Sequence, residues 1–168
     1  AKDSQALLTE LRGLIESARQ HVAQTANATL TMLYWHAGLR IRRELLKDGR
    51  AGYGEEILAT LSQELTKDYG KGFNTSALTR MTKFAEVFPD EQIVATLAQT
   101  LSWSHFIEIL PLKQPLEREY YAEMCRVERW SVRTLRERIA SQLYLRTAIA
   151  KKPEAVVQAE ISHLRDGG

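Results

Sequence analysis

A group of basic and hydroxyl side chains between residues 71 and 83 has the types and spacing needed for contacts with nucleic acid. The group comprises Lys71, Thr75, Ser76, Thr79, Arg80 and Lys83. Hydroxyl, guanidinium and ammonium groups donate hydrogen bonds to phosphate oxygens and to base edges. Residues 66–83 carry four basic side chains and one acidic one, a net charge of +3. The ordinary alternative is the solvated polar face of a helical hairpin, and the sequence leaves both interpretations open.

A second basic group lies in residues 124–152, which carry eight basic and two acidic side chains. The preceding residues, 84–123, carry seven acidic and two basic ones. The spacing of Arg129, Arg133 and Arg136 predicts that they share one face of a helix. Such a stripe could follow a phosphate backbone, with binding that weakens as salt rises. Equally, these arginines could pair with the acidic stretch, within one molecule or across a dimer.

The sequence gives no support to templates for catalysis or metal binding. Its four histidines are scattered, no Cys/His spacing resembles a zinc site, and no Walker-type glycine loop is present. The adjacent Ser104 and His105 fit a helix start better than a catalytic pair. A PD-(D/E)XK nuclease needs an acidic residue and then a Glu/Asp-x-Lys step to hold a divalent ion. Pro89–Asp90 is present without any such step, so we expect no catalytic residue, no metal and no cofactor in this chain.

Hydrophobic periodicity predicts helices along the whole chain and no strand. The first helix should begin near Ser4, and the segment Lys47–Gly52 should end the first helical region. The polar stretch Gln24–Asn27 either bends this region or is crossed without a break. Further helices are predicted over Glu55–Lys67, Asn74–Phe88, Glu91–Ala98, from Ser102, over Gln114–Val127 and from Ser131. The predicted fold class is therefore all-α.

Two of these predicted helices, Glu55–Lys67 and Asn74–Phe88, are joined by a glycine-bearing turn and resemble a helix–turn–helix. The turn is longer than the usual three or four residues. In such a unit the second helix places its N-terminal half in the major groove of DNA. Asn74 is the expected cap of that helix, with Phe73 and Leu78 packing across its start. This unit would present the basic and hydroxyl group outward.

Two Trp–Ser steps, Trp103–Ser104 and Trp130–Ser131, mark predicted helix starts. For the first we expect Ser102 to be the cap, and for the second Ser131. Apolar residues beside each cap should pack across the first helical turn as a hydrophobic staple. The aromatic residues fall mostly on predicted apolar faces, so core packing is expected for them rather than stacking on bases.

Composition indicates an ordinary globular protein. The chain has 168 residues, of which 44% are hydrophobic and 26% charged. We expect one helical domain over residues 1–150 and an amphipathic segment or linker over residues 151–168. The single cysteine, Cys125, excludes an internal disulfide and is expected in the core. No apolar run reaches the roughly 20 residues of a membrane span, and the N-terminus lacks the apolar core of a signal peptide. A cytoplasmic protein without a membrane partner is therefore predicted.

Six motifs in order resemble the N-terminal domain of YhcG-like proteins. They are YWHAGLRI (34–41), AGYGEEIL (51–58), LSQELTKDYGKGFNTSALTRM (61–81), LSWSHF (101–106), REYYAE (118–123) and ERWSVRTLRERI (128–139). The resemblance covers about residues 8–148. In that family a mostly helical N-terminal domain precedes a PD-(D/E)XK nuclease domain. These residues do not include the nuclease domain, so no catalytic residue carries over. The resemblance implies a module that delivers, orients or dimerises a nuclease on nucleic acid.

The leading hypothesis is a non-catalytic DNA-binding module that acts as a dimer with a nuclease domain, in cis or in trans. The alternative is an oligomerisation or protein-interaction module with no direct contact to nucleic acid. The long N-terminal helical region supports this alternative. The neighbouring acidic and basic stretches support it too, because they could pair between subunits.

Overall fold

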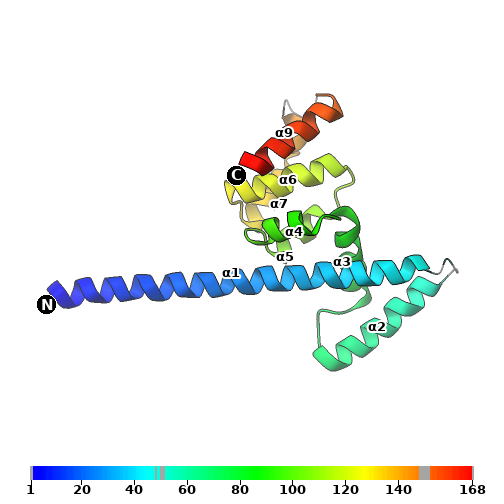
Figure 1. The fold of residues 1–168 in the computed structure, drawn as a ribbon, viewed down its shortest axis with the longest axis horizontal. Coiled ribbons are helices and arrows are strands. Elements are labelled where there is room, and N and C mark those ends of the chain that lie inside the picture. The colour runs from blue at the N-terminus through cyan, green and yellow to red at the C-terminus, as the bar shows by residue number, and fades with distance from the viewer. Residues whose placement is uncertain (1, 48, 50–51, 148–151, 168) are drawn as a thin grey trace.

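The computed structural model of the protein describes residues 2–47, 49, 52–147 and 152–167. Within these residues all regular structure is helical, so the predicted all-α fold is confirmed. The first helix, α1, spans Lys2–Lys47, and the other helices gather beside its C-terminal half (Figure 1). They are α2 (Tyr53–Tyr69), α3 (Thr75–Val87), α4 (Glu91–Ala98), α5 (Trp103–Ile109), α6 (Pro115–Glu128), α7 (Val132–Ala140), α8 (Leu143–Arg146) and α9 (Glu154–Gly167).

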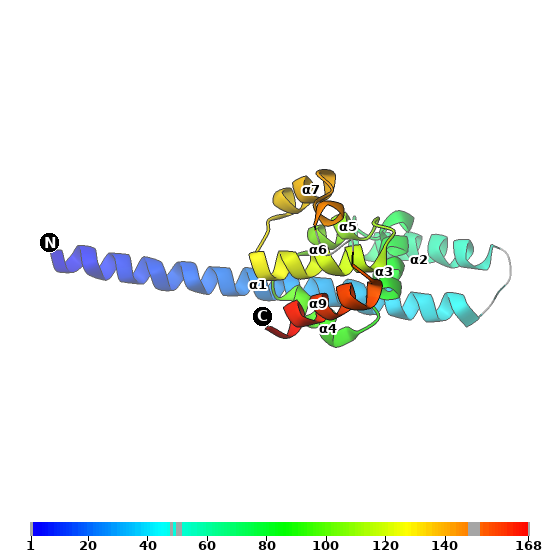
Figure 2. The ribbon, with the colours of Figure 1, turned by 90° about the horizontal axis from the view of Figure 1, so that it is seen from above.

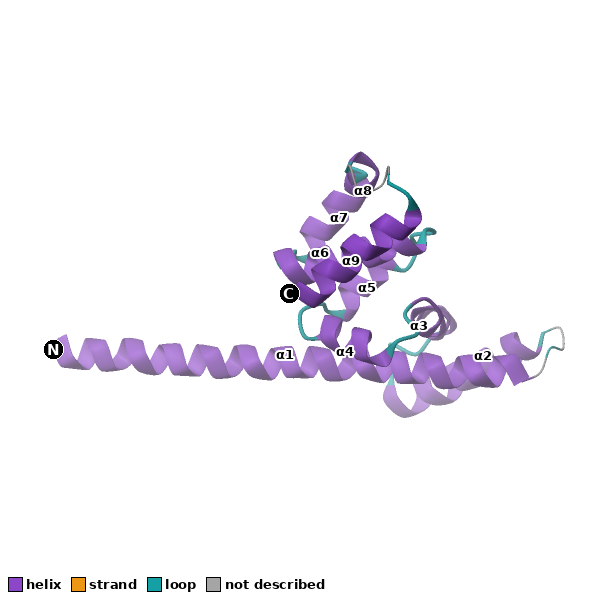
Figure 3. Ribbon diagram, turned by 45° about the horizontal axis from the view of Figure 1, so that its top comes forward, coloured by secondary structure: helices purple, strands orange, loops and turns teal. Residues whose placement is uncertain are grey.

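Helix α1 is one unbroken helix of 46 residues, which corresponds to a length of about 69 Å. It crosses the polar stretch Gln24–Asn27 without a break. Every residue from Ser4 to Asn27 is exposed, and Figure 3 shows the N-terminal part of α1 projecting clear of the other helices. In the second half Thr31, Trp35 and Gly38 are buried against the body. Among the described residues, no helix is long and apolar enough to cross a membrane.

Helix α3 crosses α1 at Gly38, and Figure 3 shows α3 almost end-on while α1 lies across the view. A Cβ atom built on Gly38 would lie only 1.9 Å from the carbonyl oxygen of Met81. Glycine is therefore required here because the two backbones approach too closely for any side chain. This contact fixes α3 against the long helix.

Aromatic side chains build the core between α1, α3 and α5. The rings of Phe84 and Phe106 have centroids 4.6 Å apart, and those of Phe88 and Phe106 lie 5.5 Å apart, edge to face. The indole Nε1–H of Trp35 donates a buried hydrogen bond of 2.7 Å to the carbonyl of Phe88. The expectation of core packing is confirmed for these aromatic residues, since all four are buried.

Side-chain caps set several helix starts where the sequence predicts them. The Asn74 carboxamide oxygen accepts a hydrogen bond of 2.7 Å from the backbone N–H of Ala77. The Ser131 hydroxyl accepts one of 3.1 Å from the N–H of Thr134. Ser102 caps α5 in a capping box with His105. The start of α2 differs from the prediction because Gly52, with φ of +82°, precedes the helix and allows it to begin at Tyr53.

Helix α9 packs on α6 of the same chain, and in Figure 2 α6 lies between α7 and α9. Val157 and Ile161 of α9 are buried in the main core. The buried carboxylate of Glu123 on α6 pairs with Arg126 at 2.9 Å and with Arg165 of α9 at 3.0 Å. The predicted amphipathic segment is thus a helix whose apolar side covers this chain's own core.

Candidate nucleic-acid interface

The predicted basic and hydroxyl group extends from the turn before α3 along this helix to Lys83. We call its six residues the α3 surface: Lys71, Thr75, Ser76, Thr79, Arg80 and Lys83. All six are exposed, as their predicted outward positions require. The opposite side of α3 is buried through Leu78, Met81, Phe84 and Ala85. Packing of the opposite side in the core therefore holds α3 in place and leaves the α3 surface exposed to solvent.

The cations of the α3 surface have no partner within the described part of the chain. The side chains of Lys71, Arg80 and Lys83 form neither an ion pair nor a hydrogen bond with any described residue. The Thr79 hydroxyl donates to the carbonyl of Thr75 at 2.8 Å, so its proton is used internally. The first turn of α3 carries no acidic residue, and the partial positive charge of a helix N-terminus adds to the attraction for anions. This surface can accept a polyanion without breaking an existing ion pair.

A glycine-bearing turn of residues 70–74 joins α2 to α3, and the likeness of this pair to a helix–turn–helix stays a prediction. Gly70 and Gly72 have φ of +81° and +111°, a backbone region that favours glycine, and they place Lys71 between them. Leu58, Leu61, Leu65 and Phe73 pack against the buried Leu78 and Met81. Helix α2 itself has no fully buried residue. Helix α3 is thus buried on one side in the core, whereas α2 packs against it at the surface of the molecule.

The predicted common face of Arg129, Arg133 and Arg136 is wrong. Helix α6 ends at Glu128, and Arg129 follows it in a left-handed conformation with φ of 52° and ψ of 46°. A new helix, α7, begins at Val132 after the Ser131 cap. Arg129 therefore belongs to neither helix, and only Arg133 and Arg136 share the surface of α7.

Arg133 and Arg136 of α7 each pair with a carboxylate of the same chain. Arg133 lies 3.4 Å from Glu137 in an exposed i,i+4 pair. Arg136 reaches Glu108 of α5 at 2.9 Å, and this hydrogen bond and the charge of Glu108 raise the pKa of Arg136 above its ordinary value. Arg136 therefore pairs with the acidic stretch 84–123 within one molecule, as one of the two interpretations of the sequence expected. Helix α7 packs on α5 and α6, and contact of its arginines with phosphates stays a prediction.

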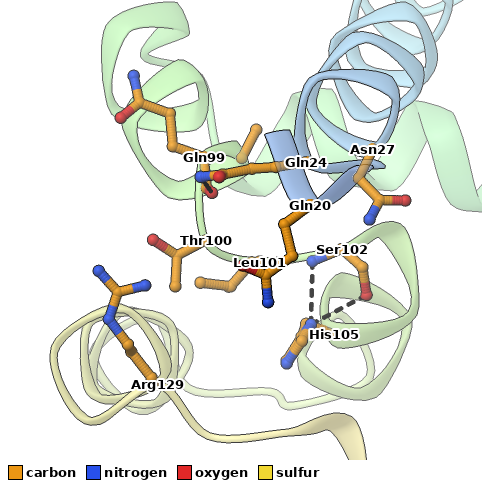
Figure 4. Close-up of a pocket in the computed structure, with 10 residues that line it drawn as sticks. Gln20, Gln24, Asn27, Gln99, Thr100, Leu101, Ser102, His105 and Arg129 are labelled. Carbon is orange, nitrogen blue, oxygen red and sulfur yellow. Dashed lines mark hydrogen bonds between the residues drawn. The ribbon is translucent and has the colours of Figure 1, made fainter. Parts of the chain in front are cut away.

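A polar cavity of about 420 Å³ lies where α1 meets the two loops that carry the Trp–Ser steps. Figure 4 shows Gln20, Gln24 and Asn27 of α1 on one side of the cavity and Arg129 on the other, with Gln99 next to Gln24. The Gln24 amide donates to the carbonyl of Gln99. Sequence reasoning missed this site. The spacing of the three α1 amides places them on one helix face and could have indicated it.

His105 closes one wall of this cavity and has a structural role. Its Nδ1 accepts the backbone N–H of Ser102 at 2.9 Å, so the proton lies on Nε2, which donates to the carbonyl of Trp130 at 2.8 Å. The buried imidazole thereby joins the two Trp–Ser loops. The predicted position of His105 at a helix start is confirmed.

Other reactive groups are few in the described part of the chain. Cys125 is buried, and burial raises the pKa of its thiol to about 12, which keeps it protonated and unreactive. No group of three or more His, Cys, Asp or Glu side chains among the described residues is arranged to hold a metal ion. That the chain is not an enzyme stays a prediction.

The comparisons with known proteins identify the family. The family described as "DUF1016 N-terminal domain" matches residues 10–146, most of the chain, so the protein belongs to it. A relative from Escherichia coli (strain K12), named "Putative nuclease YhcG", is 29% identical over 175 residues. The match covers 86% of this chain and 47% of the relative, so the chain spans about half the relative's length. No solved structure matches the chain. The resemblance to YhcG-like N-terminal domains is thereby confirmed.

Proposed function

We propose that this protein is a non-catalytic module that contacts duplex DNA through the α3 surface and holds a nuclease of its family on that DNA. The observation that carries the proposal is a group of exposed cations on α3 and on the turn before it. Helix α3 is packed against the core on its other side and is the second helix of a pair that resembles a helix–turn–helix. Lys71, Arg80 and Lys83 form no ion pair among the described residues. The relative from Escherichia coli reported above is named "Putative nuclease YhcG", and this name supports the link to nucleic acid.

The physical basis is the release of counterions from the phosphate backbone. Each lysine or arginine that neutralises a phosphate releases bound cations and makes the binding constant fall as salt rises. Three exposed cations, one on the turn before α3 and two along the helix, suit such contacts, and the hydroxyls of Thr75 and Ser76 can bond to phosphate oxygens or base edges. In this proposal the module acts in the cytoplasm as a homo-oligomer, with the nuclease domain in cis or in trans.

The test is duplex binding measured by fluorescence anisotropy over a series of salt concentrations. The Arg80→Ala/Lys83→Ala variant should bind more than about tenfold more weakly, because each charge-assisted hydrogen bond contributes about 1.5–3 kcal/mol. Its salt slope should be smaller by about two. The matched control is Arg43→Ala/Lys113→Ala, which removes two exposed charges that lie outside the α3 surface and should keep the wild-type slope. Wild-type protein that binds no duplex at low salt would overturn the proposal, as would equal losses in both variants.

A second candidate function is an oligomerisation or protein-interaction module without contact to nucleic acid. The observation that favours it is the projecting half of α1, on which Leu7, Leu14 and Ile15 are more than half exposed. The two functions are compatible, since different helices would carry them. Duplex binding that is absent while self-association is present would favour this second candidate.

A further inference from the structure

The projecting half of α1 carries an apolar surface that nothing in the described part of the chain covers. We call it the α1 seam: Leu7, Leu8, Leu11, Leu14, Ile15, Ala18 and Val22. Its six larger members are between 39% and 67% exposed. From residue 4 to residue 23, no hydrogen bond or ion pair joins α1 to another described element. Contiguous exposed apolar patches of this kind usually mark sites of association.

The α1 seam faces away from the body of the molecule. With 3.6 residues per turn, its members fall within a sector of roughly 120°. The same rotation places Gly38, which rests on α3, roughly 160° away from Ala18 around the helix. In the C-terminal half of α1, exposed residues such as Leu33, His36 and Arg40 face the same direction as the seam. A partner can therefore lie along the seam without meeting the globular part.

We propose that the α1 seam is a homodimer interface in which α1 helices of two copies pack in parallel and in register. Charge balance favours a second copy as the partner. The charged residues in this half are Glu10, Arg12, Glu16 and Arg19, so it carries no net charge that would select an acidic or a basic protein. Residues 4–27 form a rod of about 36 Å. The seven seam residues on it are fewer than the 20–30 residues per side of a standard interface, as expected for a small dimer contact.

The order of side chains favours the parallel arrangement. Leu8, Ile15 and Val22 recur every seven residues, and Leu11 and Ala18 form the second core position of the same repeat. In parallel coiled coils, β-branched residues at the first core position with Leu at the second favour two strands, and Ile15, Val22 and Leu11 follow this pattern. In that arrangement Arg12 and Arg19 lie beside Leu7 and Leu14 of the second copy, which their alkyl stems can cover. An antiparallel pair would instead bring Arg12 near Arg19 of the second copy, with like charges opposed.

The apolar pairing ends at Val22. The next core positions of the repeat are Thr25 and Thr29, which are exposed, then Met32, which packs against this chain's own core, and the exposed His36. The interface therefore covers little more than two repeats, which predicts a dimer that dissociates on dilution. The inference does not rest on the α3 surface, because each copy would keep its own α3 surface in the monomer.

The test is molar mass by light scattering over a range of concentrations, with circular dichroism to confirm helix content. Wild type should reach the mass of two chains, and Ile15→Glu should stay at the mass of one, because a charge would enter the seam. The matched control is Ser17→Glu, which adds the same charge at an exposed position on the other side of α1. It should dimerise like the wild type. Wild type that stays monomeric throughout, or an Ile15→Glu variant that dimerises equally well, overturns the inference.

Disulfide trapping tests the orientation. Ser4 occupies a core position of the repeat, and a Ser4→Cys variant in a parallel dimer should cross-link to itself on mild oxidation. An antiparallel pair would place the two Ser4 positions more than about 30 Å apart and give no such product. Cys125 does not compete, because it is buried and its thiol stays protonated. A dimer that forms without Ser4→Cys cross-linking overturns the parallel arrangement.

Discussion

Gly38 of α1 and Met81 of α3 meet backbone to backbone, so that a Cβ on Gly38 would lie 1.9 Å from the Met81 carbonyl oxygen. Two helices far apart in the sequence are thereby held at the closest approach that glycine allows. The α3 surface lies on the side of α3 opposite this contact. The position of the α3 surface relative to α1 therefore depends on Gly38, which has no side chain.

The first prediction concerns this contact. Gly38→Ala should lower the free energy of unfolding by about 3 kcal/mol, because a methyl group pressed against backbone forces the helices apart. Gly13→Ala is the matched control in the projecting half of α1, where a Cβ meets nothing within 4 Å. It should raise helix stability by up to about 1 kcal/mol. Urea unfolding followed by circular dichroism gives both values, and equal effects of the two variants would contradict this account of the crossing.

A second prediction concerns the indole hydrogen bond between α1 and the end of α3. Trp35→Phe removes the donor that reaches the carbonyl of Phe88 at 2.7 Å and leaves that oxygen buried without this partner. The free energy of unfolding should fall by about 1–3 kcal/mol for the lost hydrogen bond, in addition to the loss from the smaller ring. Trp103→Phe is the control, because the Trp103 indole N–H bonds to no described residue. Urea unfolding of both variants should show the larger loss for Trp35→Phe, and losses of equal size would show that the hydrogen bond contributes nothing.

Stability should also fall at alkaline pH. Burial raises the pKa of Cys125 from 9.0 to about 12 and also raises the pKa values of Tyr120, Tyr121 and Tyr144. Above pH 9 the unfolded chain loses the thiol proton while the folded chain keeps it, so the free energy of unfolding decreases as pH rises. Cys125 alone should contribute about 1.4 kcal/mol per pH unit up to its folded-state pKa. Urea unfolding between pH 8 and about 11 should give a shallower slope for Cys125→Ala than for wild type, and an unchanged slope would refute the contribution of Cys125.

Local signals in the sequence predicted much of the helical layout. The side chains of Asn74 and Ser131 cap the helices that they were expected to cap, and α4 spans the predicted Glu91–Ala98. Such features depend on neighbours within one turn, so short sequence windows contain the information. The outward positions of α3 were predictable for the same reason, since the buried side of the helix fixes them.

Long-range contacts were harder to predict. The sequence suggested a stripe that includes Arg129, but the left-handed conformation of this residue ends α6 and turns the chain. Arg136 finds its carboxylate 28 residues away on α5. The docking of α9 depends on Glu123, whose two arginine partners come from different helices. Each of these depends on the tertiary arrangement of separate helices, which periodicity does not encode.

A last prediction combines the α1 seam with the α3 surface and rests on both proposals. The seam lies on the side of α1 opposite Gly38, and Gly38 contacts Met81 on the side of α3 opposite the exposed cations. In a dimer joined through the seam, the two α3 surfaces therefore point away from each other. One straight duplex cannot contact both of them, unlike the paired recognition helices of common dimeric repressors. We expect each dimer to hold two separate duplex segments.

A bridging assay measures this directly. An immobilised duplex is incubated with protein and then with a second, labelled duplex, and the retained label is counted. Wild type should retain the label, whereas Ile15→Glu should still bind one duplex but retain no second one. The Arg80→Ala/Lys83→Ala variant should lose both, while Ser17→Glu should behave like the wild type. Saturation of the wild-type dimer at one duplex for every two chains would contradict the outward arrangement of the α3 surfaces, because each copy would then no longer hold its own duplex.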